Sequence, residues 1–189
     1  MNKTHWPPIQ VAAFVLLSGV LIFLSRNSLR DKAAHGFTRF FAWEAILALL
    51  VWNAPVWHDD MFSVRQIASW SLLFTSPVFA ILGLRALKTA GTTTELRQDK
   101  TLYAFEKTGH LVTTGIFARI RHPMYAALIL LAWGAYLKGV TPWTTGLVVF
   151  ASFSMWVTAR RDEAECRDFF GEAYVEYMKS TKRFIPYII

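Results

Sequence analysis

Two stretches decide how this chain folds: HLVTTGIFARIRHPMY, from His110 to Tyr125, and RRDEAECRDFFGEAYVEYMKSTKRFIP, from Arg160 to Pro186. Both are dense in charged, aromatic and turn-forming residues. The apolar residues between them, Ala126 to Ala159, form a hairpin that is long enough to cross a membrane and return. If the hairpin does so, the two polar stretches meet on one face of the bilayer, and a site can form there.

Composition indicates a membrane protein. Of the 189 residues, 54% are hydrophobic and 17% are charged, whereas a soluble domain carries about 25% charged residues. Five apolar runs are long enough, or nearly so, to cross a hydrocarbon core about 30 Å thick. These runs are Pro8–Ser25, Thr38–Trp57, Gln66–Leu87, Met124–Lys138 and Pro142–Ala159. We therefore predict an all-α integral membrane protein with five transmembrane helices.

The 20 lysines and arginines predict the orientation of these helices. Seventeen of them fall in the first loop, the third loop and the carboxyl tail, and three fall on the alternate side. Because cytoplasmic loops carry the excess of basic residues, we expect a cytoplasmic carboxyl terminus and a site on the cytoplasmic face of an inner membrane or endomembrane. This topology and contact with anionic lipids explain the net charge of +7 without a nucleic-acid partner.

We expect one structural domain in two parts. Residues 1–85 hold the first three transmembrane helices, and residues 86–189 hold the catalytic and cofactor-binding region, made of a loop, the transmembrane hairpin and an interfacial carboxyl-terminal helix. The loop Lys88–Lys100 is rich in turn formers and is predicted to cover the site. The single cysteine, Cys166, excludes an internal disulfide, and the five scattered histidines predict no metal site.

The charged residues around the hairpin suit a zwitterionic ligand. His122 and Tyr125 are three residues apart at a predicted helix start, so they share a face. Arg119 and Arg121 are suited to bind a carboxylate. The acidic residues Asp162, Glu163 and Glu165 are suited to an ammonium group or to ribose hydroxyls. A ligand with an amine, a carboxylate, a ribose and an aromatic base satisfies this set. S-adenosylmethionine is such a ligand, although these residue types alone do not single it out.

The order of the motifs RHPMY, RRDEAE, FFGEAY and RFIP resembles the isoprenylcysteine carboxyl methyltransferase family, including its small prokaryotic membrane members. The resemblance covers Ala86 to Pro186, about half of the chain. It implies a methyltransferase that uses S-adenosylmethionine. It also implies a cytoplasmic cofactor site formed by the third loop and the carboxyl-terminal helix, with a lipophilic acceptor entering from the bilayer.

The same resemblance assigns roles to individual residues. The expected cofactor-binding residues are Val112, Gly115, Arg121, His122, Tyr125 and Glu163. Arg160 matches an arginine ahead of the acidic pair and is the candidate catalytic residue, which would orient the acceptor. No metal is implied, because methyl transfer from a sulfonium needs none.

Departures from the family pattern leave the acceptor open. Residues that differ from those often found in the family are Ile116, Phe117, Ala127, Asp162 and Cys166. An isoprenylcysteine-type carboxylate, or another lipid-like carboxylate, amine or thiol, fits a site that opens to lipid. The sequence does not predict an oligomeric state.

Two other functions stay open at this point. RDE-x-x-C, an aromatic-glycine pair and the ending IPYI also resemble the carboxyl end of membrane sterol reductases, which use NADPH. Those enzymes are longer and lack the segment from TTG to RHPMY in the form found here. A non-catalytic membrane partner with the same fold is the third interpretation. Binding of S-adenosylhomocysteine rather than NADPH separates the three.

Overall fold

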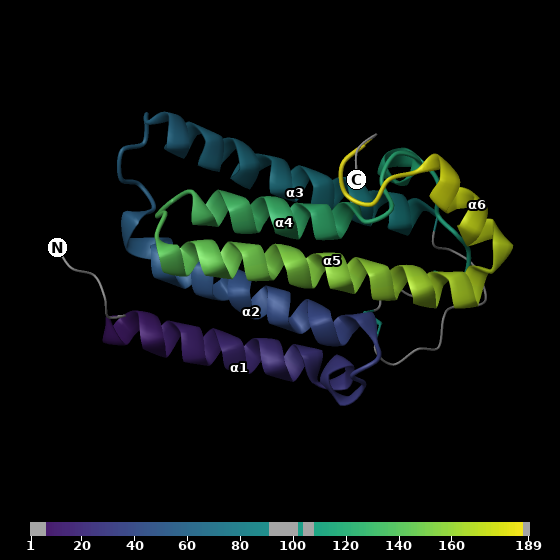
Figure 1. The fold of residues 1–189 in the computed structure, drawn as a ribbon, viewed down its shortest axis with the longest axis horizontal. Coiled ribbons are helices and arrows are strands. Elements are labelled where there is room, and N and C mark those ends of the chain that lie inside the picture. Colours follow the sequence, from purple (N-terminus) through teal and green to yellow (C-terminus); the bar gives the residue numbers. More distant parts are fainter. Residues whose placement is uncertain (1–6, 91–101, 104–107, 187–189) are drawn as a thin grey trace.

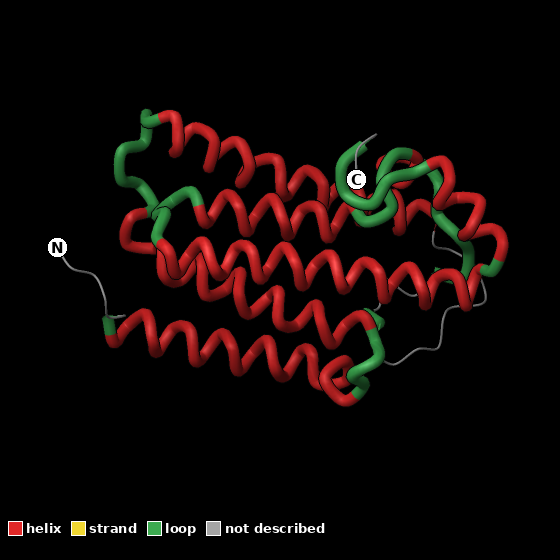
Figure 2. Tube along the Cα trace, viewed as in Figure 1, coloured by secondary structure: helices red, strands yellow, loops and turns green. Residues whose placement is uncertain are grey.

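The computed structural model describes residues 7–90, 102–103 and 108–186, and these residues form a helical bundle (Figures 1 and 2). The α-helices are α1 (Pro8–Arg30), α2 (His35–Asn53), α3 (Val64–Ala90), α4 (Pro123–Tyr136), α5 (Pro142–Phe170) and α6 (Glu172–Ser180). Two short 3-10 helices span Ala54–Val56 and Gly115–Ala118. The described residues contain no strand, so the predicted all-α class is confirmed.

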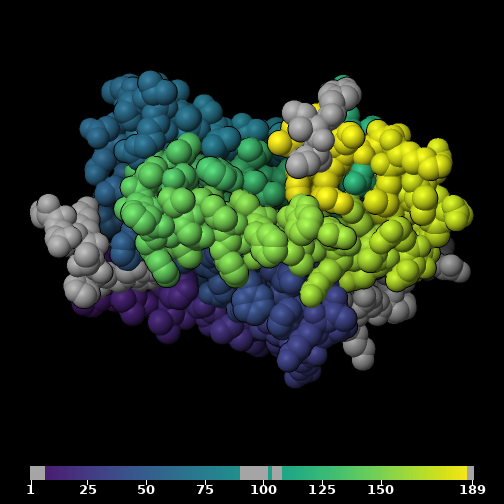
Figure 3. Space-filling view, in the orientation of Figure 1, coloured from purple at the N-terminus to yellow at the C-terminus, as the bar shows by residue number. Residues whose placement is uncertain are grey.

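Helices α1 to α5 lie side by side along the long axis of the molecule (Figure 1). Helix α2 packs against α1, α4 and α5, and α3 packs along α4. Alanines occupy many of the contacts, including the fully buried Ala42, Ala132 and Ala135, and small residues of this kind let helices approach closely. Helix α6 and the tail after it gather at one end of the bundle (Figure 3).

Among the described residues, three helical stretches are long and apolar enough to cross a membrane: α1, His35–Val56 and Val64–Thr89. Helix α4 is apolar but has 14 residues, a length of about 21 Å at 1.5 Å per residue. Helix α5 is long, but its last third is charged. The fold therefore fits an integral membrane protein, while five spans remain a prediction.

Helix α5 is longer than the sequence suggests. We expect a span that ends at Ala159 followed by a separate interfacial helix, but α5 continues without a break to Phe170. The chain holds no proline or glycine between Gly146 and Gly171 to interrupt it. At Gly171 the backbone has φ 59°, a conformation that glycine adopts at low cost, and α6 begins after it. Gly171 therefore separates α5 from α6.

Only the first residues of the segment Lys88–Lys100, which the sequence predicts to be a covering loop, belong to the described part of the structure. Helix α3 continues through Lys88 to Ala90, so the first residues of this segment are helical. The remainder lies outside the described residues.

Candidate functional site

The two polar stretches that flank the hairpin meet at the end of the bundle where α6 lies. Ile120 pairs with Lys182 in a single parallel bridge. The main-chain nitrogen of Arg121 donates to the carbonyl oxygen of Lys182 at 2.8 Å, and that of His122 donates to Arg183 at 3.1 Å. The tail therefore holds the residues immediately before α4, as the sequence predicts.

A cavity opens where these stretches meet the ends of α3, α5 and α6. It holds about 740 Å³ of free space, including space open to solvent. Its apolar lining consists of Leu87, Leu102, Leu111, Val112, Phe117, Pro123, Met124, Cys166 and Phe170. Its polar lining consists of Thr108, Arg121, His122, Tyr125, Asp162, Tyr174 and Tyr177. Such a lining suits a ligand with both an aromatic and a charged part.

The cavity wall includes four of the seven residues predicted for the site: Val112, Arg121, His122 and Tyr125. Gly115 starts the adjacent 3-10 helix with φ 62°, a left-handed conformation that favours glycine. Glu163 lies behind the wall, in contact with Arg121 and His122. Arg160 does not line the cavity.

Glu163 is the centre of a buried ionic network. The Nε atoms of Arg121 and Arg183 donate to its Oε1 at 2.9 and 3.0 Å, and Nη2 of Arg183 donates to its Oε2 at 2.7 Å. The side chain of Glu163 is only 4% exposed. Burial would raise the pKa of this carboxyl, but contacts with His122 and Arg183 outweigh burial and hold the pKa well below its usual range. Glu163 is therefore ionised and joins the tail to the start of α4.

His122 lies between two carboxylates. Its Nδ1 is 3.5 Å from Oδ2 of Asp162, and its Nε2 is 3.4 Å from Oε1 of Glu163. Burial would lower the pKa of His122, but these two partners outweigh it and raise the pKa. Because each ring nitrogen faces an acceptor, the doubly protonated imidazolium is favoured. The two carboxylates therefore favour a positive charge on this part of the cavity wall.

Tyr125 and Asp162 complete this part of the wall. The Tyr125 hydroxyl donates to Oδ2 of Asp162 at 2.9 Å, and the Tyr125 ring stacks on His122 with centroids 5.1 Å apart. Burial would raise the pKa of Asp162, yet the charge of His35 and the hydrogen bonds from His122 and Tyr125 hold it well below its usual range. The predicted shared face of His122 and Tyr125 is confirmed.

Arg160 lies on another face of α5. Its guanidinium carbon is 5.0 Å above the ring centroid of Trp156, and both residues line a second, open groove together with Glu163. Residues 160 and 162 point in different directions because successive helical positions are about 100° apart. The structure therefore brings Arg160 near the acidic network but not onto the cavity.

Sequence reasoning missed several partners of this network. Arg183 binds Glu163, and the carbonyl of Thr181 accepts from Arg121. At the start of α2, Glu165 accepts from the main-chain nitrogen of His35 at 2.7 Å and contacts its Nδ1 at 2.8 Å. The RFIP motif pointed to the tail, but no local pattern marked Arg183 as the residue that binds Glu163.

His35, Asp162 and Glu165 also form a group in which one ligand atom from each residue lies within 4.8 Å of the others. Sequence spacing gave no sign of this group. His35 bonds to Glu165 through its ring and main chain, and its Nε2 is 3.5 Å from Nη1 of Arg39. An arginine this close opposes a bound cation. The group is explained by hydrogen bonds that join α2 to α5.

The sequence of the chain matches a known protein family. Residues 64–174 match the family described as phospholipid methyltransferase. Over 81 residues the chain is 36% identical to protein-S-isoprenylcysteine O-methyltransferase of Schizosaccharomyces pombe. That alignment covers 41% of this chain and 34% of the yeast protein, so the chain matches about a third of its relative. No solved structure matches.

Proposed function

Because the chain belongs to the phospholipid methyltransferase family, we propose that it is a membrane-embedded methyltransferase that moves the methyl group of S-adenosylmethionine to a lipophilic acceptor. The observation that carries the proposal is the cavity where RHPMY meets the acidic residues of α5. The relative named above acts, by its name, on protein S-isoprenylcysteine, and the resemblance found in the sequence points the same way.

The lining of the cavity fits S-adenosylmethionine by its chemistry. Aromatic side chains, among them Phe117, Phe170 and Tyr174, suit an adenine ring. The ionised Asp162 suits ribose hydroxyls or an ammonium group, and Arg121 suits a carboxylate. We assign cofactor contacts to the residues predicted from the sequence: Val112, Gly115, Arg121, His122, Tyr125 and Glu163. Of these, Glu163 does not line the cavity, and we propose that it acts by holding Arg121 and His122 in position.

When bound, this cofactor supplies an electrophilic methyl group on a sulfonium. The chain's own task is to hold donor and acceptor in line and to exclude water, and alignment can lower a barrier by several kcal/mol. Tyr174 and Tyr177, both buried, close one side of the cavity. Burial raises the pKa of Tyr174, so its phenol stays neutral there.

The charge state of the wall favours an acceptor that needs no deprotonation. Both ring nitrogens of His122 face carboxylates, and the lowered pKa of Asp162 makes this carboxylate a weak base. Among the described lining residues, no neutral imidazole or amine is present to remove a proton from an ammonium acceptor. We therefore propose a lipid-like carboxylate of the isoprenylcysteine type, which enters laterally from the bilayer.

Arg160 stays a prediction in this scheme. We propose that it holds an anionic group of the acceptor, but its contact with Trp156 means that such an acceptor must extend along α5 outside the cavity. Arg160→Ala would then reduce turnover strongly and leave cofactor affinity nearly intact. Loss of S-adenosylhomocysteine binding in this variant would contradict the assignment.

The cofactor proposal is tested by the affinity of detergent-purified protein for S-adenosylhomocysteine, measured by calorimetry. His122→Ala, Tyr125→Phe and Glu163→Gln each remove one polar partner, and each is expected to weaken binding by about 1–3 kcal/mol. Lys182→Ala, which changes an exposed side chain at the same end, is the matched control.

Unchanged affinity for S-adenosylhomocysteine in all three variants would contradict the assignment of the cofactor site. Binding of NADPH in place of S-adenosylhomocysteine would favour a reductase, and binding of neither would favour a non-catalytic membrane partner.

A further inference from the structure

A second groove, on a different face of α5 from the cavity, is rich in positive charge. It lies between the end of α5, α6 and the tail, with about 1060 Å³ of free space, including space open to solvent. Four arginines line it: Arg160, Arg161, Arg167 and Arg183. Four guanidinium groups around one open space repel each other unless an anion lies among them.

The protein itself supplies little compensating charge. Glu163 is the acidic residue that lines the groove, and its oxygens already accept from Arg121 and Arg183. Within the described part of the chain, no ion pair involves Arg160, Arg161 or Arg167. Arg161 donates one bond, to the carbonyl oxygen of Lys32 at 2.7 Å, and the other two carry exposed charge.

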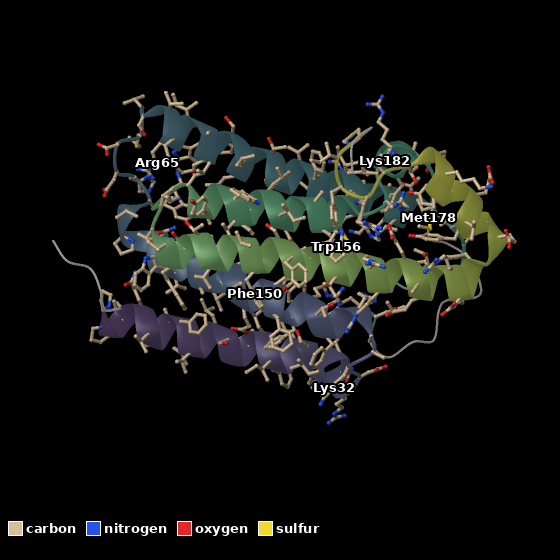
Figure 4. All side chains as sticks on the ribbon, viewed as in Figure 1. Lys32, Arg65, Phe150, Trp156, Met178 and Lys182 are labelled. Atoms are coloured by element: carbon tan, nitrogen blue, oxygen red, sulfur yellow. The ribbon has the colours of Figure 1, made fainter. Side chains whose placement is uncertain are left out.

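The groove lies where the outer surface of α5 changes from apolar to charged. Val149, Phe150 and Phe153 are exposed at 55%, 49% and 60%, and Trp156 follows them along α5 toward α6 and Met178 (Figure 4). Tryptophan at such a boundary is typical of the level of lipid headgroups. A molecule in the groove therefore has an apolar helix surface on one side and, on the other, four arginines, of which only Arg183 is paired with Glu163.

We propose that this groove binds the headgroup of an anionic phospholipid, with the phosphate among the arginines and the acyl chains along Phe150, Phe153 and Trp156. Arginine forms bidentate hydrogen bonds with phosphate oxygens, and basic pockets beside membrane helices bind anionic headgroups. The apolar surface next to the groove favours a lipid over a soluble anion, which gains nothing from it. The groove shares Arg160 with the acceptor role proposed above, but lipid binding there does not require that reaction.

The test compares bound phosphatidylglycerol with phosphatidylcholine on the full chain in detergent, by native mass spectrometry. Wild type is expected to prefer phosphatidylglycerol, and Arg160→Ala with Arg167→Ala is expected to weaken that binding about tenfold or more, since each basic residue near anionic lipid contributes about 1 kcal/mol. Arg30→Ala with Lys182→Ala removes the same charge from exposed positions outside the groove and is expected to keep the preference.

Equal loss in both double variants, or no preference in wild type, would overturn the proposal, because binding would then reflect diffuse charge or none. Millimolar inorganic phosphate that displaces phosphatidylglycerol completely would also overturn it, in favour of a site for soluble anions. Arg160→Gln with Arg167→Gln keeps polar side chains at both positions and provides the same comparison if the alanine pair does not fold.

Discussion

At one end of the bundle Glu163 accepts hydrogen bonds from Arg121 and Arg183 beside an open cavity, and at the other end Lys138 donates to Gln66 in a closed environment. Lys138 is 1% exposed, and its Nζ lies 3.5 Å from the ring centroid of Trp70. Both ends bury charge. The rings of Trp57 and Trp70 and the amide of Gln66 surround the ammonium of Lys138. Arg121 and His122, which contact Glu163, instead border the free space of the cavity.

A buried structural charge and a buried charge at a candidate site differ in what surrounds them. Three side chains, from Asn53, Arg65 and Ser69, donate to the last carbonyls of α4 and its turn, so the end near Lys138 is a helix cap built by neighbouring helices. At the opposite end Arg121, His122 and Asp162 line a cavity. A shifted pKa alone does not identify a functional site. A charged group with a shifted pKa that also borders a cavity is the better candidate.

The largest expected effect concerns the membrane sides of these two ends. If the hairpin crosses the bilayer twice, a reporter inserted after Lys138 and a reporter at the carboxyl terminus give opposite, all-or-none signals. Alkaline phosphatase and green fluorescent protein fusions measure this in cells. Two reporters on the same side would break the comparison, because the cap and the cavity would then face the same compartment.

The next effect is on stability. Glu163→Ala leaves the buried Arg121 without its carboxylate, and losing one partner of a buried ion pair costs about 3–5 kcal/mol. Lys138→Met removes a cation whose partners are neutral, and losing its hydrogen bond and ring contacts is expected to cost about 1–2 kcal/mol. Unfolding of both variants in one detergent gives the comparison, and an equal loss would show that the two ends are held alike.

The smallest effect is the pH dependence that His122 confers. Because the folded pKa of His122 is raised above 6.5, its contribution to stability is complete below the unfolded pKa and is lost as the pH rises through the folded pKa. The difference in melting temperature between wild type and His122→Gln should therefore shrink from about pH 6 upward. A difference that grows with pH would mean that the neutral imidazole is the favoured form.

What the sequence predicted well depends on neighbours in the chain. Pro8 and Pro123 begin helices as expected, because proline fits the first turn. His122 and Tyr125 share a face because their spacing is helical. Even the meeting of the two polar stretches follows from one apolar hairpin, and the family resemblance is confirmed by the match over residues 64–174.

What the sequence did not predict depends on contacts between distant residues. Glu165 lies 130 positions from His35, yet it binds the first residue of α2. The tail contains several cations, and only the folded backbone decides that Arg183 rather than Lys182 faces Glu163. The length of α5 was also missed, because a mixed charged and aromatic pattern fits an interfacial helix as well as the end of a long one.

The parallel pairing of Ile120 with Lys182 has a consequence for the order of events during synthesis. The tail residues whose main chain pairs with Arg121 and His122 leave the ribosome after α6. A growing chain can therefore place α1 to α5 in a bilayer while the segment before α4 is still untethered. The main-chain pairing that holds the segment before α4 forms only when the tail arrives, so the protein can acquire its shape as a bundle before its ligand site is held in place.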